Sequence, residues 1–104
     1  MKTYYTYILQ CVDNFLYTGV TNNIDRRIRE HQQGLNKTCF TYKRRPVNLI
    51  FHQAFNDVDQ AIYFEKKIKK WSRVKKLALA KGDFDMLQIL AECRNATRGK
   101  YKPG

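Results

Sequence analysis

The sequence lacks paired cysteines, has few histidines and contains no long apolar run, and each absence narrows the range of functions. The three cysteines are far apart, no Cys-x-x-Cys pair occurs, and only two histidines are present: Cys11, Cys39, Cys93, His31 and His52. This pattern argues against a zinc site and against a disulfide framework. No run of 18 apolar residues occurs, and the chain starts without an apolar signal region. We therefore expect a cytoplasmic protein with reduced thiols.

Acidic residues are also scarce. Nine Asp and Glu residues stand against 20 Lys and Arg residues, which gives a formal net charge of +11. Such a charge favours a polyanion partner, with nucleic acid first and an anionic membrane second. A basic surface without a special partner is the alternative. The chain has 104 residues, of which 43% are hydrophobic, and this is enough for one domain with a core.

Clusters of β-branched and aromatic residues predict three strands, at residues 3–10, 15–21 and 47–55. Asp13-Asn14 is a turn signal, so the first two strands should form a hairpin. Gly19 interrupts the second strand, which predicts either a bulge or a close approach by a backbone or a ligand.

Capping residues predict one helix before the third strand and further helices after it. A first helix of about ten residues should lie between Asn22-Asn23 and Gly34. A second should cover residues 58–71 after an Asn56 or Asp57 cap. A third should follow a Ser72 cap and continue through about Lys81, with Gly82 ending it. A short last helix is expected from the spacing of Phe84, Leu87 and Leu90-Ala91.

Glu65 is the most unusual residue, because it falls within the apolar stripe of its helix, whereas the neighbouring lysines point away from it. At about 100° per residue, the stripe consists of Val58, Ala61, Phe64, Ile68 and Trp71. An unpaired buried carboxylate costs several kcal/mol, so a cation or hydrogen bonds must stabilise it. Glu65 is therefore either a ligand of a divalent metal beside a phosphate or half of a structural ion pair with a nearby Arg or Lys.

Two polar residues of the first helix also lean toward the interior. Ile24 and Ile28 define its apolar side, His31 falls on that side, and Arg27 lies at its edge. Arg27 and His31 are four residues apart and are therefore neighbours on the helix. They either serve a site, or the Arg27 stem packs with its head in water and His31 is a hydrogen-bonded core residue.

Basic residues are concentrated in two stretches, the loop before the third strand and the eleven residues from Lys66 to Lys76, of which seven are basic. Such a run is either a solvated face or a surface that follows a phosphate backbone. It gives affinity for phosphates rather than base readout. The residues expected to contact nucleic acid are Lys43, Arg44, Arg45, Lys69, Lys70 and Arg73.

Five motifs follow one another at characteristic spacing: Tyr5-Thr6-Tyr7-Ile8-Leu9, Tyr17-Thr18-Gly19, Arg27, His31 and Glu65. In this order they resemble the GIY-YIG endonuclease superfamily, and above all its small stand-alone bacterial branch, in which the nuclease-like domain is the whole protein. Residues 43–47, 68–73 and 90–95 also agree with that branch. Each motif alone is weak, whereas the ordered set is specific.

The resemblance implies an α+β (α/β) fold, with a small mixed, mainly antiparallel three-stranded sheet flanked by helices. The domain would cover residues 1–95, followed by a basic flexible tail at 96–104. Tyr7 and Tyr17 can face one pocket only if the hairpin loop has an odd number of residues, because side chains alternate along a strand.

The sequence departs from the family in places. Tyr5 stands where the first motif has its Gly, and Thr6 and Thr18 replace the central Ile residues. Residues 20–22 lack a Lys that many catalytic relatives carry. These differences affect the expected rate and substrate, whereas the Tyr, Arg, His and Glu positions are intact.

The reaction implied by the resemblance is phosphodiester hydrolysis with one divalent metal. Glu65 would hold Mg²⁺ or Mn²⁺, and Arg27 would stabilise the charge that develops in the transition state. Tyr17 would be the general base, if the site lowers its pKa far below ~10. Tyr7 would orient the water or the phosphate, and His31 would share the base role or steer Tyr17 and Arg27.

Two main hypotheses for function remain. One is a DNA endonuclease of low sequence specificity, acting on branched, single-stranded or damaged DNA in repair or recombination, and the intact Glu65 favours it. The other is a non-catalytic or weakly catalytic nucleic-acid-binding module, which the missing Gly and Lys favour. An RNA-acting protein is a third and weaker interpretation. We expect a monomer with no membrane partner, in which a partner protein or the substrate's shape supplies target choice.

Overall fold

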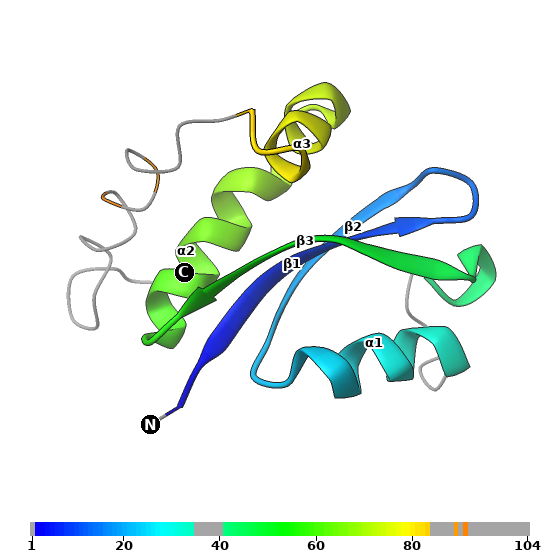
Figure 1. Cartoon of the computed structure of the whole chain (residues 1–104), viewed down its shortest axis with the longest axis horizontal. Coiled ribbons are helices and arrows are strands. Elements are labelled where there is room, and N and C mark those ends of the chain that lie inside the picture. The colour runs from blue at the N-terminus through cyan, green and yellow to red at the C-terminus, as the bar shows by residue number, and fades with distance from the viewer. Residues whose placement is uncertain (1, 35–40, 84–88, 90, 92–104) are drawn as a thin grey trace.

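The computed structural model describes residues 2–34, 41–83, 89 and 91. These residues contain three strands, three α-helices and one 3₁₀ turn (Figure 1). Each strand begins and ends within one residue of its predicted span. In chain order the elements are β1 (Tyr4–Cys11), β2 (Leu16–Thr21), α1 (Ile24–Gln33), η1 (Tyr42–Arg44), β3 (Val47–Phe55), α2 (Val58–Lys69) and α3 (Arg73–Ala80).

The strands form one sheet in the order β2-β1-β3, so β1 is central and β2 and β3 are the edge strands of the described sheet. Both strand pairs are antiparallel, so the described sheet is antiparallel throughout rather than mixed. The predicted three-stranded sheet flanked by helices is otherwise confirmed.

The turn between β1 and β2 has three residues, 12–14, because Cys11 N–H donates to the Phe15 carbonyl oxygen at 2.9 Å. Asn14 N–H donates to the Cys11 carbonyl oxygen, also at 2.9 Å, and Asn14 has a φ of +68°. A type I turn followed by a left-handed residue is a common three-residue hairpin loop, and Asn tolerates the left-handed region better than most residues.

This odd loop places Tyr7 and Tyr17 on the same face of the sheet. Leu9 pairs with Tyr17 and Tyr7 pairs with Gly19, and residues that are paired or two apart share a face. The condition for the two tyrosines to face one pocket is therefore met.

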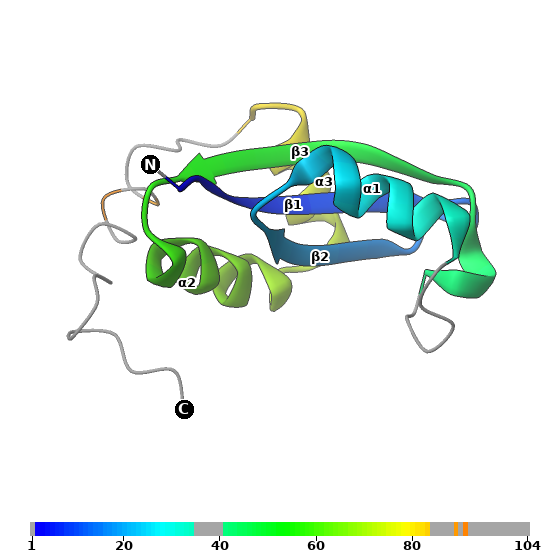
Figure 2. The same cartoon turned by 90° about the horizontal axis from the view of Figure 1, so that it is seen from below.

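Helices cover both faces of the sheet, with α1 on one side and α2 and α3 on the other (Figures 1 and 2). The larger apolar cluster packs under α2 and α3 and includes Ile8, Leu16, Phe55, Ala61, Phe64, Ile68, Leu79 and Ile89. The smaller cluster contains Tyr7, Leu9, Cys11 and Val47, with Ile24 and Ile28 of α1 packed against it. The sheet therefore separates an apolar core from a thinner layer in which polar side chains occur.

The predicted helix caps are confirmed. Asn23 and Ser72 accept hydrogen bonds from backbone N–H groups three residues later, and Asp57 rather than Asn56 caps α2. Gly34 follows α1 with a φ of +67°, the left-handed conformation that favours glycine after a helix.

Most of the predicted last helix and the whole tail at 96–104 lie outside the described residues. Ile89, which is described, is buried in the larger cluster. In the described part of the chain, no helix is long and apolar enough to cross a membrane.

Candidate active site

Helix α1 holds Arg27 and His31 over the sheet face that carries Tyr7. Arg27 Nε donates a hydrogen bond to the Tyr7 hydroxyl oxygen at 3.3 Å, and the same hydroxyl lies 3.2 Å from His31 Nε2. Tyr7 is 1% exposed and His31 is 5% exposed. The predicted inward lean of His31 is thus correct, and the buried Tyr7 and His31 form a polar network with the half-buried Arg27.

One hydrogen-bond direction in this network is fixed. A guanidinium only donates, so the Tyr7 oxygen accepts from Arg27 Nε. His31 Nε2 lies 3.2 Å from the same hydroxyl and His31 Nδ1 lies 2.7 Å from Thr41 Oγ1, and the tautomer of the imidazole decides which ring nitrogen donates. The Arg27 guanidinium and the His31 imidazole therefore share the Tyr7 hydroxyl.

Arg27 and His31 have pKa shifts in opposite directions. The hydrogen bond with Tyr7 raises the pKa of Arg27 above its already high ordinary value, although burial opposes this. Burial, and then the positive charge of Arg27, lowers the pKa of His31 below its ordinary 6.5. Arg27 is therefore a permanent cation, and the imidazole is neutral at physiological pH and can accept a proton.

We expect the shifted pKa of His31 to make folding stability depend on pH. Because the folded pKa lies below the unfolded value, the unfolded chain binds more protons in this window. The free energy of unfolding should be fully retained above about pH 6.5 and should decrease as the pH falls from there toward the folded pKa. Denaturant unfolding across this range would show a weaker decrease for His31→Gln than for the wild type. His52, which is exposed, provides the control: if His52→Gln removed the decrease and His31→Gln kept it, the assignment would be wrong.

Tyr17 completes the aromatic side of the site and is more accessible than Tyr7. Its ring centroid lies 5.1 Å from that of His31, edge to face, and 6.3 Å from that of Tyr7. Tyr17 is half-buried whereas Tyr7 is enclosed. Of the two tyrosines, Tyr17 is thus the one that an entering water or phosphate can reach.

Gly19 allows the Tyr7 ring to lie against β2. A Cβ at position 19 would be 2.6 Å from the Tyr7 hydroxyl oxygen and 2.8 Å from its Cζ, distances that Cβ atoms essentially never adopt. The close approach predicted for Gly19 is real, but a side chain makes it rather than a backbone or a ligand. The Gly of the second motif therefore serves the Tyr of the first.

Gly19→Ala should destabilise the fold and displace the Tyr7 hydroxyl from Arg27 and His31. Overpacking of a well-packed interior typically costs about 1–3 kcal/mol of unfolding free energy, which denaturant unfolding measures. The cost should be smaller in a Tyr7→Phe background, because the closest overlapping atom is then absent. Equal costs in both backgrounds would show that Tyr7 is not the residue that excludes a side chain.

Glu65 has a cation beside it. Its side chain is 15% exposed, and its carboxylate lies 3.7 Å from Lys69 Nζ, one turn further along α2. The interpretation of Glu65 as half of an ion pair thus has a structural partner. Lys69 is itself exposed, and ion pairs of this kind contribute only about 0–1 kcal/mol, so another cation can replace it.

Two pockets are lined by residues of α2 together with residues of the candidate site. One, of about 350 Å³, is lined by Arg27 and by Val58 of α2, and the other, of about 250 Å³, is lined by Tyr17 and Lys69. Val58, Glu65 and Lys69 are seven and four residues apart and so share one face of α2. Glu65 therefore lies on the face of α2 that borders both pockets, although it lines neither of them.

The Glu65 carboxylate suits a hard divalent ion whose other ligands are waters and substrate phosphates. Mg²⁺ is commonly held by one or two carboxylates, several waters and substrate phosphates, and Glu65 supplies one such carboxylate. Within the described residues, no group of three or more His, Cys, Asp or Glu side chains gathers. A zinc site of the usual N and S ligands is thus not formed in that part of the chain.

The structure places the six predicted nucleic-acid contacts differently from one another. Arg44 pairs with Asp13 at 2.9 Å, and Arg73 donates to the Asn14 carbonyl oxygen, so both reach the β1–β2 turn. Arg45 stacks over the Tyr42 ring, with 4.8 Å from its Cζ to the ring centroid, while Lys43 and Lys70 are exposed. Lys69 pairs with Glu65, so four of the six are held by contacts inside the protein.

Two residues of the network were not predicted from the sequence. Glu30 accepts a hydrogen bond from Arg27 Nη1 at 3.1 Å, and its position three residues after Arg27 is a signal for such a pair. Thr41 has no such signal, because its contact with His31 joins two residues that are ten apart in the sequence.

Comparison with known proteins identifies the family. The family model of the GIY-YIG catalytic domain matches residues 3–78. A UPF0213 protein of Syntrophus aciditrophicus is 42% identical over 81 residues, which are 78% of this chain and 93% of that protein. A UPF0213 protein of Haloquadratum walsbyi is 39% identical over 85 residues, 82% and 94% of the two chains.

Solved structures agree with this result. The solution structure of a UPF0213 protein from Bacillus halodurans is 38% identical and covers 76% of this chain and 83% of that one, with a TM-score of 0.50. That of a protein from E. faecalis is 34% identical and covers 80% and 88%, with a TM-score of 0.57. With the sheet, the Tyr7, Arg27 and His31 network and Gly19 in place, the chain belongs to the GIY-YIG domain family and, within it, to the small UPF0213 proteins.

Proposed function

We propose that the protein is a metal-dependent endonuclease that hydrolyses phosphodiester bonds in DNA with low sequence specificity. The observation that carries this proposal is the polar network in which Arg27 and His31 share the Tyr7 hydroxyl, with the accessible Tyr17 beside it. Family membership supports the reaction class. The geometry adds a division of labour among the residues.

A scissile phosphate beside Tyr17 would meet the permanent charge of Arg27, which stabilises the negative charge that develops on the phosphate oxygens. Tyr17, as its phenolate, would take a proton from the attacking water, whose oxygen forms the new bond to phosphorus as the bond to the leaving oxygen breaks. A solvent water would then protonate the leaving oxygen. Tyr7 and His31 are buried and act as positioning residues that hold Arg27 and Tyr17. Glu65 would hold Mg²⁺ or Mn²⁺, which supplies Lewis-acid stabilisation of the phosphate when bound.

Basic residues that hold phosphates do not read bases. We therefore propose that substrate shape or a partner protein selects the target. The proposed role is in DNA repair or recombination. DNA rather than RNA is the proposed substrate.

One observation favours a nucleic-acid-binding module without useful turnover as the second candidate. Glu65 is ion-paired with Lys69, and a carboxylate with a resident cation needs no metal to be stable. The choice between the two candidates depends on whether Glu65 is needed for cleavage.

The test is cleavage of labelled single-stranded, duplex and branched DNA and of RNA by purified protein with Mg²⁺, Mn²⁺ or EDTA. Wild type is compared with Glu65→Gln, and with Asp25→Asn as the control for loss of one carboxylate at an exposed position. Cutting of DNA that requires metal and Glu65, but not Asp25, would support the nuclease. Binding without cutting, unchanged in Glu65→Gln, would favour the binding module, and preferential cutting of RNA would overturn the choice of DNA.

A further inference from the structure

A second polar feature lies where the β1–β2 hairpin meets the end of α2 and α3. The pocket of about 250 Å³ described above has two lysines in its wall and no acidic residue, and its lining residues are Phe15, Leu16, Tyr17, Thr18, Lys69 and Lys76. Phe15 and Tyr17 also line this pocket. Cations together with aromatic residues are a common arrangement for holding a nucleic-acid strand.

Thr18 is a buried polar residue that the fold itself does not explain. It is 6% exposed, and its hydroxyl oxygen is the one buried side-chain polar atom in the described part of the chain that has no hydrogen-bond partner. An unsatisfied buried hydroxyl costs roughly 1–3 kcal/mol, so its presence points to a partner that arrives later.

Thr6 provides an internal comparison. It also stands where the family motif has Ile, and it lies on the same sheet face as Thr18. Its hydroxyl donates to the Ala61 carbonyl oxygen at 2.8 Å, which ties β1 to α2. One substitution is thus satisfied by the fold, whereas the other leaves an unsatisfied buried hydroxyl on a residue that lines a basic pocket.

The two lysines are close enough to affect each other. Burial, and then the nearby charge of Lys69, lowers the pKa of Lys76. Lys69 has Glu65 as a partner, whereas Lys76 has no carboxylate partner in the described part of the chain. An anion in the pocket would reduce the repulsion between the two ammonium groups and provide an acceptor for the Thr18 hydroxyl.

We propose that this pocket binds one phosphate group of the nucleic-acid backbone, next to the phosphate that reacts beside Tyr17 and Arg27. The identity of the polyanion rests on the proposed function. Lys76 and Lys69 supply charge-assisted hydrogen bonds, and Thr18 donates a third. Because Tyr17 borders both this pocket and the catalytic network, the pocket would fix the position of the strand relative to the reactive groups.

The first test uses Thr18→Val, which has nearly the same shape without the hydroxyl. We expect this variant to unfold at a higher denaturant concentration, because an unsatisfied buried polar group is gone, and to bind single-stranded DNA about threefold to tenfold more weakly. Higher stability with unchanged affinity would overturn the role of the hydroxyl in the site.

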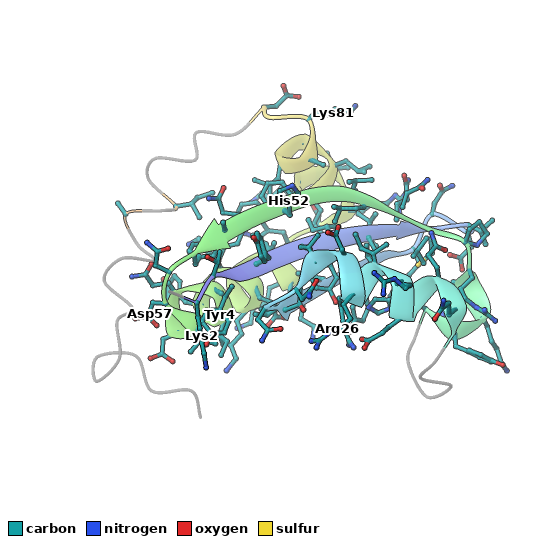
Figure 3. The ribbon with its side chains drawn as sticks, turned by 60° about the horizontal axis from the view of Figure 1, so that its bottom comes forward. Lys2, Tyr4, Arg26, His52, Asp57 and Lys81 are labelled. Carbon is teal, nitrogen blue, oxygen red and sulfur yellow. The ribbon has the colours of Figure 1, made fainter. Side chains whose placement is uncertain are left out.

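The second test measures DNA affinity against salt concentration for Lys76→Gln. Lys76 is chosen because Lys69 also pairs with Glu65. We expect affinity to fall at least about tenfold and the slope of log K on log salt to decrease by about 0.7 for a single strand. The control is Lys81→Gln, an exposed lysine at the end of α3, on the side of β3 away from α1 (Figure 3). Equal effects of the two substitutions would show a diffuse basic surface and overturn the pocket.

Inorganic phosphate separates the sources of the anion. Its titration is followed by the backbone NMR signal of Thr18 in wild type, Lys76→Gln and Lys81→Gln. Saturable shifts lost only in Lys76→Gln, together with the weaker DNA binding, support a backbone phosphate site. Saturable shifts with DNA affinity unaffected by Lys76→Gln would mean a site for free phosphate and overturn the proposal. These are binding measurements, so a protein that binds but never cuts would refute the nuclease while leaving the pocket intact.

Discussion

Arg27→Ala should reduce the single-turnover rate of DNA cleavage by about 10²–10³-fold, which is the usual effect of removing one preorganised group that stabilises transition-state charge. The loss should exceed any loss of DNA affinity, because Arg27 is held by Tyr7 and Glu30 in a fixed position before substrate arrives. Rates are measured at saturating protein, with affinity measured separately by DNA titration.

The matched control is Arg29→Ala. Arg29 lies two residues further along α1 and is exposed, so it removes the same charge from the same helix without touching the network. Arg27→Lys should recover only part of the rate, since Lys keeps the charge but lacks the planar fork that reaches Tyr7 and Glu30 together. If Arg27→Ala and Arg29→Ala lowered affinity equally and neither changed the single-turnover rate, Arg27 would be a surface charge and the proposed mechanism would fail.

Tyr17→Phe and Tyr7→Phe should differ in what they damage. Tyr17→Phe removes the accessible hydroxyl and should lower the cleavage rate by about 10²–10⁴-fold, the range of general acid–base catalysis, with little change in stability. Tyr7→Phe removes a buried hydroxyl that serves Arg27 and His31, so it should also lower the free energy of unfolding by about 1–3 kcal/mol.

Denaturant unfolding and single-turnover cleavage on the same two variants distinguish these roles. The pH dependence of the single-turnover cleavage rate of Tyr7→Phe adds a further measurement, because His31 loses a hydrogen-bond partner in this variant. A Tyr17→Phe enzyme as fast as wild type would exclude Tyr17 as the base. The general-base role would then pass to another group near the phosphate.

The local features were predictable from the sequence because local rules decide them. Strand spans follow from β-branched and aromatic residues, and the caps at Asn23, Asp57 and Ser72 follow from their side-chain oxygens. The four-residue spacing of Arg27 and His31 placed both on one side of α1. An odd hairpin loop was the condition for Tyr7 and Tyr17 to share a face, and the three-residue turn of the structure meets it.

Features that depend on distant segments were not predictable in the same way. Nothing around Gly19 indicates that a Tyr hydroxyl would occupy the space of its missing side chain. The unsatisfied hydroxyl of Thr18 and the satisfied one of Thr6 look alike in the sequence, and only the position of α2 separates them. Charge counting likewise could not show that Arg44 and Arg73 are both used to hold the β1–β2 turn.

The central position of β1 has a consequence for the order in which the site assembles. Residues 7–31 contain Tyr7, Tyr17, Arg27 and His31, so the tyrosine and cation half of the site forms from one contiguous segment that closes only a short hairpin. Glu65 comes from α2, which joins only after the chain has travelled through β3 and returned to the sheet. Short loops close sooner than long ones. During folding, the part of the site that contains the two tyrosines, Arg27 and His31 should therefore form before Glu65 joins it, and catalytic competence should appear last.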